Sequence, residues 1–127
     1  MKKINVLFVD DGPSMHELVK AILQDHPEIN LVHAYHGVHA WQLIRNLGVD
    51  FDIVVTDKHM PHMDGLELAK KVRKQFPNTT VVLISDDERE PGGHEAHAFI
   101  PKPFGSGDFY GRLLSLIMEV GSAKPKS

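Results

Sequence analysis

The segment 51–57, FDIVVTD, constrains the fold of this chain more than any other. Its centre, 53–55, is apolar and β-branched, which is typical of a strand buried on both faces, as in a parallel sheet. The apolar run stops at Asp57, and Pro61 shortly afterwards cannot continue a ladder and turns the chain. Asp57 is therefore either an ordinary polar residue at a strand end or a functional carboxylate, because ligands bind at that edge of open α/β sheets.

The rest of the chain alternates between strand and helix patterns. Short apolar runs predict strands over 4–9, 31–35, 51–56, 80–84 and 98–100. Helical spacing and the placement of proline and glycine predict helices over 13–25, 38–47, 66–76 and 104–120. This alternation predicts an α/β fold, a flavodoxin-like doubly wound parallel sheet of five strands in the order 2-1-3-4-5. We expect one domain over 1–121 and a flexible polar tail over 122–127.

Composition excludes several kinds of protein. The chain has 127 residues, 42% of them hydrophobic, which is enough for one core. Its net charge of −3 does not suggest nucleic-acid binding, and the absence of cysteine excludes disulfides and thiolate chemistry. No apolar run approaches the length of a membrane span or a signal-peptide core, so we expect no membrane association and a cytoplasmic location.

Three carboxylates are predicted to meet. Asp10 and Asp11 follow the first strand and Asp57 ends the third, and these strands are neighbours in the predicted order. Like charges that close together repel and need compensation. A divalent cation with oxygen ligands would supply it, and a site with few protein ligands favours Mg²⁺. The alternative is that the three acids spread into solvent.

Two further strand ends point to the same edge. Ser85 follows the fourth strand and Lys102 follows the fifth. A hydroxyl, an ammonium group and Mg²⁺ together suit the charge of a transferring phosphoryl group. Asp57 would then be the nucleophile that forms an aspartyl phosphate.

With these motifs the chain resembles the receiver domains of two-component response regulators, including the single-domain chemotaxis type. The matching motifs run in order through nearly the whole chain: Val9-Asp10-Asp11, the segment 57–65 (DKHMPHMDG), Ser85, and Lys102-Pro103-Phe104. The resemblance implies the same five-stranded sheet order that the strand and helix patterns predict.

The resemblance implies specific roles and partners. Asp57 would accept phosphate from a phosphohistidine on a sensor histidine kinase or phosphotransfer protein, and Ser85 and Lys102 would contact the phosphoryl group. Asp10, Asp11 and Asp57 would hold Mg²⁺ with the backbone carbonyl of His59. Phe99 falls where the family has a rotating aromatic switch residue, and signalling would pass to a downstream protein that the sequence does not identify.

The connection between the fourth and fifth strands departs from the family. Only twelve residues, 86–97, lie between them, near the minimum for a parallel crossover. They include an acidic run and Pro91-Gly92-Gly93 but no apolar helical stripe. We therefore expect the family's fourth helix to be missing or shortened. Phe99 would then lack the element against which it switches.

Asp86 is the second departure. The resemblance suggests a small residue directly after Ser85, where this chain has a carboxylate. If Asp86 faces the site, it would repel an incoming phosphoryl group and modulate its transfer or removal. The alternative is that it points outward.

Nine histidines raise the question of a zinc site. Pairs at short spacing occur, but without cysteine they lack an obvious third ligand, so we expect surface histidines instead.

Three functions remain open. The first is a phosphoacceptor receiver of a two-component phosphorelay, which is not an enzyme beyond assisting its own phosphotransfer and dephosphorylation. The second is a degenerate receiver that acts as a phosphorylation-independent interaction module. The third is a Mg²⁺-dependent aspartyl phosphatase, which would need a second carboxylate two residues after Asp57, where this chain has His59.

Overall fold

The computed structural model describes residues 3–46, 50–87, 89–102 and 108–123. All its strands are parallel and form one sheet in the order β2-β1-β3-β4-β5, which confirms the predicted topology. The strands are β1 (Ile4–Val9), β2 (Ile29–Ala34), β3 (Ile53–Asp57), β4 (Thr80–Ser85) and β5 (Ala98–Pro101).

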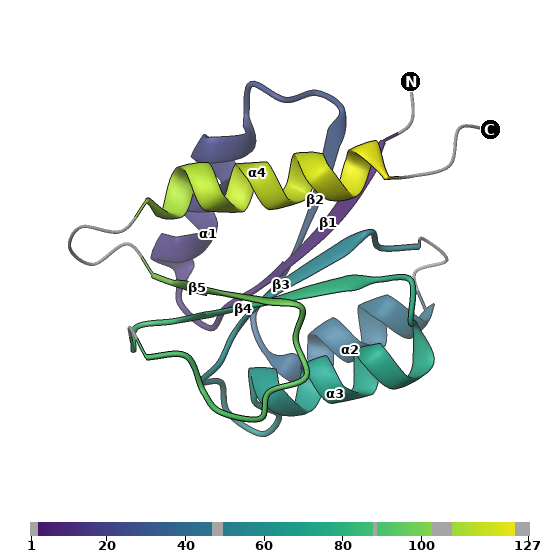
Figure 1. Cartoon of the computed structure of the whole chain (residues 1–127), viewed down its shortest axis with the longest axis vertical. Coiled ribbons are helices and arrows are strands. Elements are labelled where there is room, and N and C mark those ends of the chain that lie inside the picture. Colours follow the sequence, from purple (N-terminus) through teal and green to yellow (C-terminus); the bar gives the residue numbers. More distant parts are fainter. Residues whose placement is uncertain (1–2, 47–49, 88, 103–107, 124–127) are drawn as a thin grey trace.

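Helices cover both faces of this sheet. They are α1 (Pro13–Leu23), α2 (Gly37–Asn46), α3 (Gly65–Gln75) and α4 (Phe109–Ser122). Helices α1 and α4 lie on one face, and α2 and α3 lie on the other (Figure 1). Each face therefore has its own apolar core, and every residue of the central strand β3 is buried between them.

Local sequence explains where the helices begin. Pro13 stands in the first turn of α1, where its missing N–H costs nothing. The Asp64 side chain accepts a hydrogen bond of 2.8 Å from the backbone N–H of Glu67 and so caps α3. Gly65 lets α3 start directly against the end of β3, because a Cβ atom there would collide with the carbonyl oxygen of Asp57.

The connection between β4 and β5 contains no helix in the residues of 86–97 that the structure describes, which are all but residue 88. This confirms the predicted loss of the fourth helix of the family. The segment is held instead by single hydrogen bonds. Arg73 Nη1 of α3 donates to the Glu95 carbonyl at 2.9 Å, and the Val81 N–H of β4 donates to His97 Nδ1 at 3.0 Å.

Element boundaries differ from the predictions at a few places. Strand β2 begins at Ile29, two residues before the predicted strand, because β1 pairs with it from Ile4 onward. Helix α4 continues to Ser122, past the predicted end at 120, with Gly121 packed closely against the side chain of Ile4. The predicted helix residues 104–107 and 47 lie outside the described residues, as does most of the predicted tail.

None of the described helices combines the length and apolar character needed to cross a membrane.

Candidate functional site

Carboxylates from two strand ends meet at the carboxyl edge of the sheet. Asp10 and Asp11 follow β1, and Asp57 is the last residue of β3. One oxygen from each of the three lies within 4.8 Å of the others. Asp10 and Asp57 are buried, whereas Asp11 is exposed. The structure thus brings together the three acids that the sequence pointed to, and they do not spread apart into solvent.

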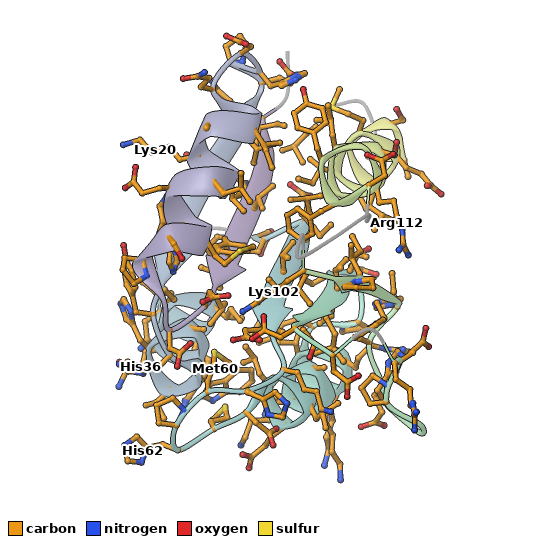
Figure 2. All side chains as sticks on the ribbon, turned by 90° about the vertical axis from the view of Figure 1, so that its left-hand side faces the viewer. Lys20, His36, Met60, His62, Lys102 and Arg112 are labelled. Carbon is orange, nitrogen blue, oxygen red and sulfur yellow. The ribbon has the colours of Figure 1, made fainter. Side chains whose placement is uncertain are left out.

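Lys102 reaches this cluster from the end of β5. Its Nζ lies 2.9 Å from Asp10 Oδ2 and 3.2 Å from Asp57 Oδ2. Figure 2 shows the amine of Lys102 beside carboxylate oxygens. Burial by itself would lower the pKa of Lys102, but its contact with Asp10 and the charges of Asp10 and Asp57 outweigh burial, and the pKa is raised. The ammonium group is therefore charged at neutral pH.

Burial and the Lys102 ammonium shift the pKa of Asp57 in opposite directions. Burial raises the pKa of its carboxyl group above the ordinary value, the charge of Lys102 lowers it, and the charge of Asp10 raises it again, with a net upward shift. The His59 N–H lies 3.4 Å from Asp57 Oδ1 and orients it weakly. Asp57 is thus a desolvated carboxylate with one nearby cation.

The two carboxylate oxygens of Asp10 differ in their hydrogen bonding. Its Oδ1 accepts a hydrogen bond of 2.8 Å from the Gly12 N–H. Its Oδ2 is fully buried and has the charge of Lys102 nearby, but no donor among the described residues is aligned to hydrogen-bond it. A buried carboxylate oxygen with a free lone pair is a hard ligand, suited to a cation such as Mg²⁺.

Ser85 ends β4 and is buried. Its Oγ accepts a hydrogen bond of 3.1 Å from the Asp87 N–H, which leaves the hydroxyl proton available to a further acceptor. Its carbonyl oxygen accepts from the Lys102 N–H at 2.7 Å. The ends of β4 and β5 are therefore tied together, which brings the backbone of Ser85 next to that of Lys102.

Asp86 stands at the mouth of the site. Its side chain is 70% exposed, yet its Oδ1 lies 3.7 Å from Lys102 Nζ. The sequence left open whether Asp86 faces the site or points outward. In the structure its side chain is largely in solvent but still forms an ion pair with Lys102.

An open cavity borders Asp11. It has a volume of about 390 Å³ and is lined by Asp11, His59, Met60, Pro61 and Asp64. Figure 2 shows Met60 below Lys102 in this region. His59 is thus at the rim, next to the acids with which its carbonyl was expected to act.

Phe99 is part of an apolar core. It is 6% exposed and belongs to the core on the α2 and α3 face, as do Leu83 and Ala96. Its carbonyl oxygen accepts a hydrogen bond of 3.0 Å from Arg112 Nη2 of α4. The aromatic ring expected to switch is therefore a buried core residue in this structure.

One residue beside the site did not emerge from the sequence. His16 of α1 is buried, and its Nε2 lies 2.8 Å from the carbonyl oxygen of Asp10. The expectation that histidines lie on the surface is wrong for this one. The signal was available, because His16 continues the stripe that Val19 and Leu23 form on the buried side of α1.

A comparison with known protein families matches residues 6–113 to the response regulator receiver domain. Two curated relatives are chemotaxis proteins. The chain is 34% identical over 86 residues to the CheY homolog of Campylobacter jejuni, covering 66% of this chain and 65% of that protein. It is 33% identical over 86 residues to CheY1 of Helicobacter pylori, covering 66% and 68%.

A longer relative also matches. The chain is 32% identical over 111 residues to the putative two-component response regulator ARR13 of Arabidopsis thaliana, but it covers only 19% of that protein. The chain therefore spans less than two thirds of the length of ARR13 and of the Campylobacter CheY homolog.

Solved structures show the same architecture. The receiver domain of the putative response regulator NarL from Mycobacterium tuberculosis superposes with a TM-score of 0.80 at 27% identity, covering 98% of this chain and all of that one. The response regulator TrrA from Thermotoga maritima, solved in complex with Mg²⁺ and BeF, gives a TM-score of 0.78 at 25% identity, covering 94% and 99%. With its sheet order, its acidic edge and these matches, the chain belongs to the receiver domain family of two-component response regulators, which are signalling modules and not classical enzymes.

Proposed function

We propose that this receiver domain accepts a phosphoryl group from a phosphohistidine onto Asp57. The observation that carries the proposal is the position of the Lys102 ammonium, 2.9 Å from Asp10 and 3.2 Å from Asp57, beside three converging carboxylates. A desolvated carboxylate next to a fixed cation suits nucleophilic attack on phosphorus followed by stabilisation of the product.

The residues present fit Mg²⁺. Asp10, Asp11 and Asp57 would hold the ion with the backbone carbonyl of His59, and the buried Asp10 Oδ2, which has no aligned hydrogen-bond donor among the described residues, offers it a hard oxygen ligand. When bound, Mg²⁺ would offset the negative charge on the transferring phosphoryl oxygens. In support, the similar receiver TrrA was solved with Mg²⁺ and BeF.

The protein's own groups would act as follows. A carboxylate oxygen of Asp57 attacks phosphorus as the P–N bond of the phosphohistidine breaks, and the departing histidine nitrogen keeps the bonding electron pair. The Lys102 ammonium lies within reach of a phosphoryl oxygen on Asp57, and the free proton of the Ser85 hydroxyl can be donated to another. The domain would thus assist only its own phosphorylation and, by attack of water, its own dephosphorylation.

Asp86 would modulate both steps. Its carboxylate competes with the phosphoryl group for Lys102 and adds negative charge at the entrance. Phosphorylation would therefore be slower than with a neutral residue at this position.

The partners would be a sensor histidine kinase or a phosphotransfer protein upstream and a further protein downstream, in the cytoplasm. Neither nucleic acid nor membrane is expected to bind this chain. The domain would occupy 1–121, with 122–127 as a tail.

The proposal is tested by incubating the protein with acetyl phosphate and Mg²⁺ and measuring intact mass. We expect the mass to rise by one phosphoryl group, with no rise in Asp57→Asn. Asp64→Asn is the matched control, because asparagine also caps a helix and the residue lies nearby without joining the acid cluster.

If the wild-type protein is not modified while it remains folded, the phosphoacceptor proposal fails. The chain would then be a phosphorylation-independent interaction module. Turnover of a phosphoester substrate would favour a phosphatase instead.

A further inference from the structure

His16 is a buried histidine whose two ring nitrogens both have partners. It is 3% exposed, and its ring packs against the edge of Phe8 and beside Tyr35. Nε2 lies 2.8 Å from the carbonyl oxygen of Asp10, and Nδ1 lies 2.7 Å from Nδ1 of His33 on β2. The ring therefore links α1 and β2 to the residue that follows β1.

The Asp10 carbonyl fixes the position of one proton on the His16 ring. A carbonyl oxygen only accepts hydrogen bonds, so His16 Nε2 must carry a proton and donate it to Asp10. Two ring nitrogens at 2.7 Å share one proton, so the nitrogen of His16 or of His33 donates to the other. This second contact holds the plane of the His16 ring and so aims its Nε2–H.

The Asp10 peptide is held from several directions. Its N–H donates to the Ala34 carbonyl at 3.2 Å, and its side-chain Oδ1 accepts from the Gly12 N–H. The contact from His16 holds the Asp10 carbonyl, and it acts at the point where the chain leaves β1. Rotation of this peptide would move the Asp10 carboxylate relative to Asp57 and Lys102.

We propose that His16 is a positioning residue, which holds the Asp10 backbone so that the Asp10 carboxylate faces the acid cluster. The inference rests on the proposed function only for the consequence that Mg²⁺ affinity depends on His16. Groups that orient metal ligands from behind typically change metal affinity by about 10–100-fold when they are removed.

Two substitutions separate this role from simple packing. Glutamine can place an amide N–H near the position of Nε2 and so can still donate to the Asp10 carbonyl. Asparagine places its amide near the position of Nδ1 and falls short of Asp10. Both lose the ring contacts with Phe8 and Tyr35, so His16→Gln and His16→Asn form a matched pair.

The first measurement needs no metal. Hydrogen exchange of the Gly12 amide, which donates to Asp10 Oδ1, should be faster in His16→Asn and close to wild type in His16→Gln. The second measurement is a calorimetric titration with MgCl₂ alone. The affinity for Mg²⁺ should be about tenfold lower in His16→Asn than in wild type and within about twofold of wild type in His16→Gln.

The outcomes distinguish the two proposals. If wild type binds Mg²⁺ but the two variants match each other in both measurements, positioning by His16 is overturned and the proposed function is untouched. If wild type binds no Mg²⁺ while Gly12 exchange still separates the variants, the metal role fails and positioning stands. If His16→Asn does not fold, ¹⁵N spectra of the wild-type imidazole decide, because an Nε2 without a proton contradicts the inference and a protonated one supports it.

Discussion

The two halves of the sheet are built differently. In the described residues from β1 to β3 a helix follows each strand, and the acid pair stands at a strand end. Between β4 and β5 an irregular segment replaces the helix, held by contacts such as those of Arg73 and His97. The carboxylates and Lys102 nevertheless meet, since strand register and the bond from the Lys102 N–H to the Ser85 carbonyl suffice to place them. The difference teaches that the acids and Lys102 are brought together by strand ends, without a helix between β4 and β5 in the described residues.

Lys102 connects the two halves, and its removal should lower stability more than any other change proposed here. Lys102→Met leaves Asp10 and Asp57 as buried charges without their cation, and we expect the free energy of unfolding to fall by about 3 kcal/mol at neutral pH. Without Lys102 the pKa of Asp57 would rise further, so the loss should shrink as pH falls and the acids take up protons. Urea denaturation at several pH values measures this. An equal loss at every pH would show that Lys102 acts through packing.

Asp86 lies at the boundary between the halves, and its effect should be kinetic. Asp86→Ala removes a negative charge 3.7 Å from Lys102 and should speed phosphorylation by acetyl phosphate several-fold. Asp86→Asn keeps the size of the side chain and should give a similar gain. An unchanged rate in both variants would mean that the irregular segment has no influence on the site.

His97 should make the irregular half sensitive to pH. Its pKa is lowered by burial and by the charge of Arg73, and its Nδ1 accepts the Val81 N–H. Because the pKa in the folded state lies below that in the unfolded state, stability is complete above the unfolded value and is lost as pH falls through the folded value. Asparagine offers an oxygen acceptor at every pH, so His97→Asn should reduce this loss in thermal melts below neutral pH. Identical pH profiles for the two proteins would exclude His97 as the cause.

Arg73 should have the smallest effect. Arg73→Ala removes an exposed hydrogen bond to the Glu95 carbonyl and should cost about 1 kcal/mol or less. Phosphorylation with acetyl phosphate should be unchanged, with Arg73→Lys as the control that keeps the charge. A marked loss of phosphorylation in Arg73→Ala would contradict the view that strand ends alone form the site, since the segment 86–97 would then also support it.

The sequence predicted the strand ends of both halves well because its signals are local. Apolar runs that end in Asp10, Asp57, Ser85 and Lys102 were enough to place these residues at one edge, since parallel strands end at the same side of a sheet. The absence of a helical stripe in 86–97 likewise predicted the missing helix.

What lay beyond prediction depends on contacts between distant residues. No local pattern pairs His16 with His33, which lie on different elements and meet only when α1 packs against the sheet. For Phe99 the sequence left open a core or a half-exposed position, because its burial depends on which chain segment packs against β5 in place of a helix.

The glycine that opens α3 has a mechanical consequence. Gly65 sits against the carbonyl of Asp57, and its own N–H is bonded to the Lys58 carbonyl at 2.9 Å, so the backbone of Asp57 is packed tightly on the side of α3. If Asp57 is phosphorylated as proposed, the start of α3 has no room to move toward its backbone. The added charge would then act through Lys102, whose Nζ lies 3.2 Å from Asp57 Oδ2 and 3.7 Å from Asp86 Oδ1 of the short crossover.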